Sequence, residues 1–147
     1  MNISKTTEIT EGEFAGWKTW KNEPFEYETA GPFYLRIDDK GPVAAFRAER
    51  KHMNASGAMH GGCLMTFADY ALFAIADEVL GGYGVTIAFT SEFLDAALVG
   101  EYLEARGDIL RNGRSLTFIR GIVTANHRPV LNFSGTIKKA YKQPDVS

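Results

Sequence analysis

The sequence predicts an α+β domain in which one long buried helix is enclosed by a curved antiparallel sheet. Residues 61–80 are apolar around the whole helical circumference, which is typical of a helix buried on all sides. The residues after this helix divide into four segments rich in β-branched and aromatic side chains, joined by short turns. Short connections favour antiparallel neighbours, so we expect the one available sheet to wrap around the helix.

The composition is that of an ordinary globular domain. A length of 147 residues suits a single domain, and 45% hydrophobic and 23% charged residues are usual values. A net charge of -2 argues against a nucleic-acid partner, which normally requires a concentrated basic patch. The single cysteine, Cys63, excludes an intramolecular disulfide and a cysteine-based metal cluster. We expect a cytoplasmic protein without a metal site or a membrane contact, because no apolar run approaches the roughly 20 residues of a membrane span.

The first 30 residues are expected to form a lead-in to a main domain over residues 31–147. Phe14, Trp17 and Trp20 recur at intervals of three, which predicts a short amphipathic helix before Pro24. A hairpin turn is expected at residues 111–114, which contain an Asn-Gly pair. Strands are predicted over residues 33–37, 43–48, 85–94, 101–110, 115–125 and 130–140, and a helix over residues 61–80.

Asp69 is the most informative residue because it is the only charged side chain between Gly61 and Ala76. A carboxylate on an apolar helix costs several kcal/mol of desolvation unless a partner satisfies it. Ionisable groups in such positions are often functional. The alternative is a structural aspartate that caps a loop or pairs with an arginine.

The sequence His60-Gly61-Gly62 lies at the start of the predicted helix. The first N–H groups of a helix have no partner within it, and the helix dipole adds positive potential there. Two glycines allow a close approach, so this end suits the negative charge that develops on a carbonyl oxygen during acyl transfer. The alternative is a tightly packed junction between loop and helix, and the three residues alone favour it.

The spacing between these two features predicts an oligomer. His60 and Asp69 are nine residues apart, which places His60-Gly61 and Asp69 on opposite faces of the helix with a rise of roughly 13 Å between them. They are not expected to meet within one chain. If both serve one reaction centre, two subunits must supply it, and a two-fold dimer would hold two equivalent composite sites.

The pattern His52-x-Asn54-x-x-Gly57-x-x-His60-Gly61-Gly62-x6-Asp69 resembles the signature of the hotdog-fold acyl-CoA thioesterases. It is most similar to the group that contains the phenylacetate-pathway thioesterases and the thioesterase superfamily member 2 proteins. The resemblance extends from about residue 31 to 140. It implies a hotdog fold, a dimer or tetramer, and hydrolysis of an acyl- or aryl-acyl-CoA to the acid and CoA. No cofactor is implied, since coenzyme A is part of the substrate.

The resemblance also implies roles for individual residues. The Gly61 N–H would polarise the thioester carbonyl, and Asp69 of the facing subunit would activate water or attack the thioester. Asn54 would position the thioester or the water, Thr86 would assist the water, and His60 would be a supporting hydrogen-bonding residue. Gly57 and Gly62 are assigned to the substrate-binding part of the signature.

Other residues receive more ordinary interpretations. Arg111, Arg114 and Lys138 are candidates for binding CoA phosphates, although each could equally be a solvated strand end. His52 and His127 are read as surface or turn residues. We interpret Cys63 as a packing residue, because no base accompanies it at a suitable spacing.

Two other functional classes remain open. One is a hotdog hydratase or dehydratase, although those relatives usually pair an acidic residue with a histidine in a different motif, which is not found here. The other is a non-catalytic module that binds acyl-CoA, against which Asp69 on the buried helix is weak evidence. The identity of the acyl group is not predicted.

Overall fold

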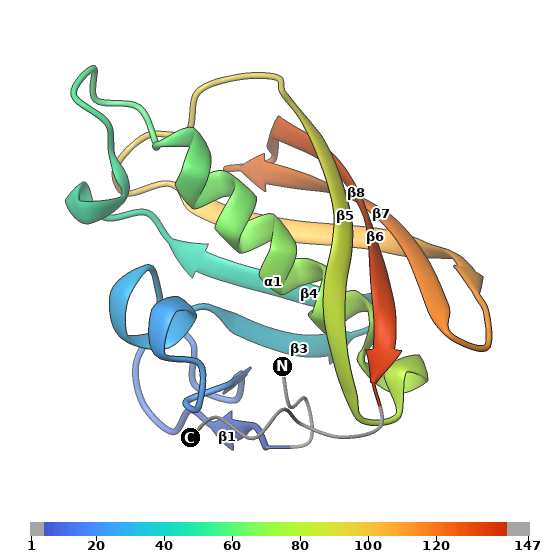
Figure 1. Ribbon diagram of the computed structural model, residues 1–147. Coiled ribbons are helices and arrows are strands. Elements are labelled where there is room, and N and C mark those ends of the chain that lie inside the picture. Colours follow the sequence, from blue (N-terminus) through green and yellow to red (C-terminus); the bar gives the residue numbers. More distant parts are fainter. Residues whose placement is uncertain (1–4, 141–147) are drawn as a thin grey trace.

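The computed structural model describes residues 5–140, which form one long helix wrapped by an antiparallel sheet of eight strands (Figure 1). The strand order is β1-β2-β3-β4-β6-β7-β8-β5. The α+β arrangement expected from the sequence is confirmed. The strands are β1 (Thr7–Glu8), β2 (Lys18–Thr19), β3 (Tyr34–Asp38), β4 (Gly41–Arg47), β5 (Tyr83–Phe93), β6 (Tyr102–Asn112), β7 (Leu116–Ala125) and β8 (Arg128–Ala140). The helices are the π-helix η1 (Pro24–Thr29), the 3-10 helix η2 (Arg50–His52) and the α-helix α1 (Gly61–Leu80).

Helix α1 has the predicted bounds. It begins after the cap residue His60 and ends at Gly81, whose φ of 62° is the left-handed conformation that glycine adopts most readily. Its apolar faces contact five strands, β4, β5, β6, β7 and β8. Among the described residues, no helix is long and apolar enough to cross a membrane.

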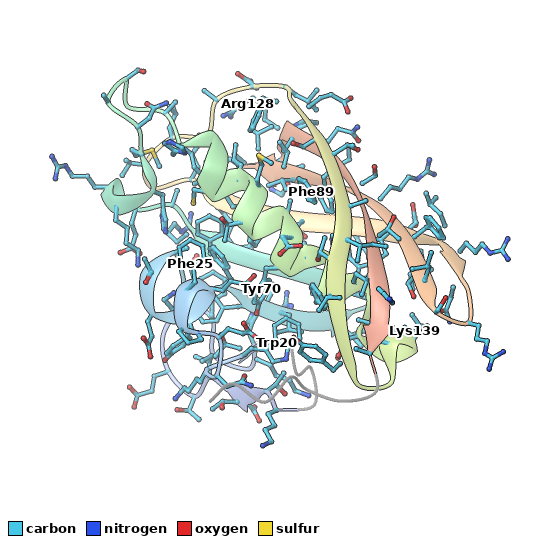
Figure 2. All side chains as sticks on the ribbon, viewed as in Figure 1. Trp20, Phe25, Tyr70, Phe89, Arg128 and Lys139 are labelled. Carbon is cyan, nitrogen blue, oxygen red and sulfur yellow. The ribbon has the colours of Figure 1, made fainter. Side chains whose placement is uncertain are left out.

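A cluster of aromatic rings joins α1 to the strands on one side. The ring of Phe67 on α1 lies 4.7 Å from that of Phe46 on β4 and 5.2 Å from that of Phe33, measured between centroids. The hydroxyl of Tyr70 donates a hydrogen bond to the Phe33 carbonyl at 3.2 Å, and the Tyr70 ring packs against Trp20 (Figure 2). These contacts hold the N-terminal segment, β3 and β4 against the same face of α1.

The predicted helix around Phe14, Trp17 and Trp20 is wrong. This region forms turns and the short strand β2, and the first helix begins later, at Pro24. Gly16 has a φ of 87°, which a right-handed helix cannot contain. The three aromatic side chains also separate, since Trp20 joins the main core while Phe14 and Trp17 form a second cluster with Val43, Ala45, Tyr34 and Tyr102.

The six predicted strands are all present, with ends that differ from prediction by at most two residues. Strand β6 extends through Arg111 and Asn112, so the β6–β7 turn begins at Gly113 and is shorter than expected. The strands β1 and β2 were not predicted. They are only two residues long, too short to show an alternating pattern.

Strand β5 is one edge of the sheet, because it pairs with β8 alone. Its register with β8 shifts between Thr86 and Ala88, which marks a β-bulge at Ile87. The side chains of Val85, Ile87 and Phe93 are exposed. An open edge of eleven residues with exposed apolar side chains is typical of a strand that pairs with another chain.

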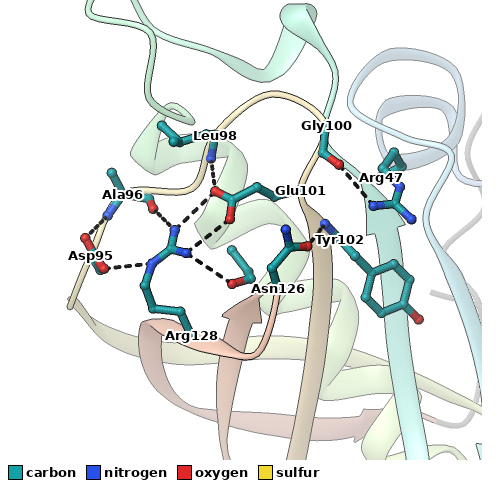
Figure 3. A network of polar contacts seen from close by, with 10 residues as sticks. Arg47, Asp95, Ala96, Leu98, Gly100, Glu101, Tyr102, Asn126 and Arg128 are labelled. Atoms are coloured by element: carbon teal, nitrogen blue, oxygen red, sulfur yellow. Dashed lines mark hydrogen bonds and ion pairs between the residues drawn. The ribbon is translucent and has the colours of Figure 1, made fainter.

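The loop between β5 and β6 is held by Arg128 (Figure 3). The guanidinium of Arg128 binds the carboxylates of Asp95, at 2.8 Å, and Glu101, at 3.1 Å, and donates to the Ala96 carbonyl at 2.6 Å. The carbonyl of Ala97 in the same loop accepts the N–H of Met59 at 2.8 Å, two residues before α1 begins. Arg128 therefore fixes the loop that lies beside the N-terminus of α1.

We expect Arg128→Met to lower the urea midpoint of unfolding at pH 7, because Glu101 is buried and would lose its cation. The Arg128 guanidinium holds the pKa of Glu101 below the ordinary value of 4.5. This stabilisation is present above pH 4.5 and is lost as the pH falls further, so the difference between variant and wild type should narrow in acid. Arg120→Met is the control, since the Arg120–Asp108 pair is 3.9 Å apart and exposed. Equal midpoints for the two variants at pH 7 would contradict the prediction.

Candidate functional site

The first turn of α1 leaves one backbone donor free. The Nδ1 atom of His60 accepts the Gly62 N–H at 2.9 Å, and the His60 carbonyl accepts the N–H groups of Cys63, at 2.9 Å, and Leu64, at 3.2 Å. Within residues 5–140 the Gly61 N–H has no acceptor. It points from the positive end of the helix dipole and can bind an oxygen atom from a ligand.

The two glycines keep this end of the helix open. A Cβ atom on Gly61 would lie 3.0 Å from the Phe93 ring, and one on Gly62 would lie 3.0 Å from Nδ1 of His60. Larger side chains at either position would push against Phe93 or the capping imidazole. Because Nδ1 of His60 accepts a hydrogen bond, the proton of the neutral imidazole is on Nε2.

Asp69 and Thr86 are brought together by α1 and β5. The hydroxyl of Thr86 donates to Oδ1 of Asp69 at 2.7 Å, and the bulge follows Thr86 directly. The Asp69 carboxylate is largely removed from water, and this burial raises its pKa. The Thr86 hydrogen bond acts in the opposite direction, because it favours the ionised form.

The expected placement on opposite faces of α1 is wrong for Gly61. Gly61 lies against Phe93 of β5 and Asp69 lies against Thr86 of β5, so both face the same strand. The nine-residue interval on which the prediction was based runs from His60 to Asp69, not from Gly61. The side chain of His60 is the cap of the first helical turn. Gly61 and Asp69 are instead separated along the helix axis, by about 12 Å for eight residues.

Asn54 and Gly57 shape the loop before α1. Oδ1 of Asn54 accepts the N–H groups of Ser56, at 2.9 Å, and Ala58, at 3.2 Å, and Gly57 adopts a φ of 86°. Asn54 is exposed, and among the described residues its amide nitrogen has no acceptor. The structure therefore places Asn54 in a tight turn near the site, without a contact to Gly61 or Asp69.

His52 is not a surface residue, so that interpretation is wrong. Its side chain is buried against the Phe46 ring, with Nε2 2.7 Å from the Ala30 carbonyl and Nδ1 accepting the Glu49 N–H at 2.9 Å. Burial lowers the pKa of His52, so the ring is neutral at neutral pH. The partner Ala30 is 22 residues away, which no local pattern reveals. His127 does lie in a turn, with a φ of 70°.

The basic candidates lie at the other end of the molecule. Arg111, Arg114 and Lys138 are exposed near the β6–β7 turn, away from the N-terminus of α1 (Figure 1). Within one chain the structure does not bring them to Gly61. Lys138 is paired with Val85, which is next to Thr86 on β5. The three basic residues are therefore nearer to Thr86 than to Gly61.

Cys63 is a packing residue, as expected. It is half-buried against the main core, and burial raises its thiol pKa to about 11. The thiol is therefore protonated at neutral pH and is a poor nucleophile. In the part of the chain that the structure describes, no three His, Cys, Asp or Glu side chains gather to hold a metal ion.

Glu26, which lies on η1, was not predicted as a site residue. Its side chain is only 9% exposed, and its Oε2 atom has no hydrogen-bond partner within the described chain. Burial, together with the charges of Asp69 and Glu23, raises the pKa of Glu26 to about 8. A neutral carboxylic acid thus lies near the Asp69 carboxylate. No signal could have found it, since Glu26 is 43 positions from Asp69 in a segment interpreted as a lead-in.

Comparisons with solved structures support the hotdog fold. The structure is similar to a hypothetical thioesterase with coenzyme A from Streptococcus pneumoniae, with a TM-score of 0.65, 23% identity, and coverage of 72% of this chain and 86% of that one. It is also similar to a mutant of the phenylacetic acid degradation protein PaaI from Thermus thermophilus, with a TM-score of 0.69, 24% identity, and coverage of 80% and 100%. At these identities the likeness shows the fold.

Sequence comparison extends this result to the family. The chain is 27% identical over 77 residues to acyl-coenzyme A thioesterase 13 of Homo sapiens, which covers 52% of this chain and 55% of the relative. The chain thus spans about half the length of the curated relatives it matches. The family model of the Thioesterase superfamily matches residues 56–131, a range that includes Gly61, Asp69 and Thr86. Since this match covers half of the sequence, the chain belongs to the thioesterase superfamily.

Proposed function

We propose that the protein hydrolyses an acyl-CoA thioester to a free acid and CoA. The observation that carries the proposal is the pair of chemical groups along β5: a free N–H at Gly61 and a carboxylate bonded to a hydroxyl at Asp69 and Thr86. The family match and the structural likeness to a thioesterase with coenzyme A support this substrate class.

The Gly61 N–H would bind the thioester carbonyl oxygen, where negative charge develops during attack. Asp69 would take a proton from a water molecule as the water oxygen attacks the carbonyl carbon, and Thr86 would hold the carboxylate in place. The carbon–sulfur bond then breaks, and the proton passes to the leaving CoA thiolate. A carboxylate whose pKa is raised by burial is a stronger base than an exposed one. Direct attack by Asp69 would use the same geometry.

The Gly61 N–H of one chain and the Asp69 carboxylate of another would meet across a two-fold axis. Thr86 and Phe93 are equidistant from the point between Phe89 and Thr90 on the open edge strand β5. If two copies of β5 pair antiparallel about that point, Thr86 faces the partner's Phe93. Asp69 is then brought toward the partner's Gly61, which the separation along α1 prevents within one chain. The exposed apolar side chains of β5 support such a dimer, and two dimers could form a tetramer.

The same pairing offers a role for the basic residues. Lys138 pairs with Val85 and Leu116, so it lies at the end of β5 that carries Thr86, near the turn with Arg114. Across the axis this end meets the N-terminus of the partner's α1. Lys138, Arg111 and Arg114 would then border the composite centre and could bind the CoA phosphates. Asn54 and Gly57 would form the rim on the Gly61 side, and Gly62 would leave space for the substrate.

Glu26 would keep the charge at this centre low. At neutral pH it retains its proton, so Asp69 can ionise without a second negative charge beside it. Ionisation of Glu26 above about pH 8 would place two negative charges near the same face of α1. Burial of an ionised group without a partner is costly, so this feature links protein stability to pH.

We expect Asp69→Asn to lower kcat for acyl-CoA hydrolysis by about 10²–10⁴-fold, because the amide cannot accept the proton of water. The measurement is thiol release from a panel of acyl-CoAs. Asp77→Asn is the control, since Asp77 is a half-buried aspartate on the same helix but away from Thr86. An Asp69→Asn enzyme as active as the control would refute the proposed base.

The composite site predicts complementation between two inactive variants. Gly61→Val and Asp69→Asn homodimers should each be inactive. An equal mixture, unfolded and refolded together, should recover about a quarter of wild-type activity, because half of the dimers are mixed and each mixed dimer has one intact centre. Refolding each variant alone is the control. No recovery, although mass spectrometry detects mixed dimers, would rule out a centre shared between chains.

Glu26→Gln should stabilise the protein in alkaline solution. The pKa of Glu26 rises from 4.5 to about 8 on folding, so its contribution to stability is full below pH 4.5 and is lost as the pH rises to about 8. The variant should exceed wild type by on the order of a few kcal/mol in free energy of unfolding at pH 9, and by little at pH 4. Urea unfolding at each pH measures this, with the exposed Glu28→Gln on the same helix as control. If the free energies of unfolding of Glu26→Gln and wild type changed in parallel with pH, the raised pKa of Glu26 would be refuted.

A further inference from the structure

A groove of about 400 Å³ opens beside the first turn of α1. One wall consists of α1 residues, among them Gly62, Cys63 and Thr66, and the opposite wall is formed by Phe25 and Thr29 of η1. Figure 2 shows Phe25 on the side of η1 that faces α1. The groove lies next to the free Gly61 N–H, because Gly62 and the cap His60 both line it. Its volume is within the range of about 300–1,000 Å³ that is usual for small-molecule sites.

Three of the polar side chains that line the groove, those of His52, Thr66 and Lys51, already have partners. Both ring nitrogens of His52 are engaged, and Thr66 donates its hydroxyl to the Gly62 carbonyl at 2.8 Å. The Nζ atom of Lys51 donates to the Gly31 carbonyl at 2.5 Å. The surface that a ligand would contact in the groove is therefore mainly apolar, and it comes from Phe25, Ala30 and the protonated Cys63.

Phe25 is the unusual residue of this groove. Its ring is 59% exposed, although the neighbouring side chain of Glu26 is buried. An apolar ligand between Phe25 and α1 would cover this ring and the groove wall, which removes apolar surface from water and so favours binding. The residues Pro24–Thr29 lie outside the part of the chain that matches the family, residues 56–131. This wall is therefore built from a segment outside the range that the family model matches.

We propose that this groove binds the apolar acyl group of the thioester, and that Phe25 determines which acyl lengths are accepted. The proposal rests on the hydrolase function proposed above. With the carbonyl oxygen on the Gly61 N–H, the acyl chain would extend past Gly62 and Thr66 and under the Phe25 ring. Acetyl groups would be too short to reach Phe25, whereas hexanoyl and decanoyl groups would cover it.

The test compares acetyl-CoA, hexanoyl-CoA and decanoyl-CoA in wild type, Phe25→Ala and Thr29→Trp. Phe25→Ala removes one wall, and Thr29→Trp narrows the groove from an exposed position whose side chain makes no hydrogen bond to the rest of the described chain. Ile37→Ala is the matched control, because Ile37 is also 59% exposed but lies on β3 outside the groove. Phe25→Ala should lower kcat/KM for decanoyl-CoA about tenfold relative to acetyl-CoA, and Thr29→Trp should also reduce decanoyl-CoA turnover selectively. Ile37→Ala should leave the ratio unchanged.

Binding is measured separately from turnover. In an Asp69→Asn background, calorimetric titration should show that Phe25→Ala raises the Kd for decanoyl-CoA about tenfold and leaves the Kd for free CoA unchanged. If wild type releases no thiol from any acyl-CoA but decanoyl-CoA binding still depends on Phe25, the hydrolase function fails and the groove assignment stands. If wild type is active but Phe25→Ala and Thr29→Trp change kcat/KM for all three substrates by the same factor, the groove assignment is overturned. An effect of Ile37→Ala equal to that of Phe25→Ala would overturn it too.

Discussion

The burial of α1 is the constraint on which the rest of the structure depends. Strands β4 to β8 cover most of the helix, and the rings of Phe33 and Phe46 pack against that of Phe67 on α1. Desolvation of so much apolar surface is the main favourable contribution to folding. What stays open is a narrow strip that includes Gly61, Gly62, Met65 and Asp69, between β5 and η1. The Gly61 N–H and the Asp69 carboxylate both lie on this strip, where a ligand can reach them.

The way in which the helix begins decides which backbone atoms remain available. A side-chain cap normally satisfies one of the free N–H groups of the first turn. Here the cap is an imidazole, and it binds the Gly62 N–H, while the His60 carbonyl takes the next two. The Gly61 N–H is left with the positive end of the dipole behind it. His60 thus contributes to the site by binding a neighbouring donor, which agrees with a supporting role and requires no proton transfer by the imidazole.

The acidic groups show how a carboxylate can be tolerated on a buried helix. Asp69 has one hydrogen-bond donor, Thr86, and lies at the margin of the core. Glu26, which approaches from η1, would double the negative charge if it were ionised, and its burial prevents this at neutral pH. The burial of Glu26 therefore lowers the negative charge near Asp69 at neutral pH. This arrangement needs no arginine or lysine beside Asp69, which would lower its pKa and weaken it as a base.

The sequence by itself determined the features that depend on neighbours along the chain. The bounds of α1, its capping end, the six longer strands and the isolated Asp69 all follow from periodicity and from residues within a few positions of one another. Only the tertiary structure decided that Phe14 and Trp17 separate from Trp20, that His52 is buried on Ala30, that β5 is the strand which Gly61 and Asp69 face, and that Glu26 lies near Asp69. Each of these depends on contacts between segments distant in sequence, and their pairing follows from how the sheet curves around α1. Local periodicity contains no information about that curvature.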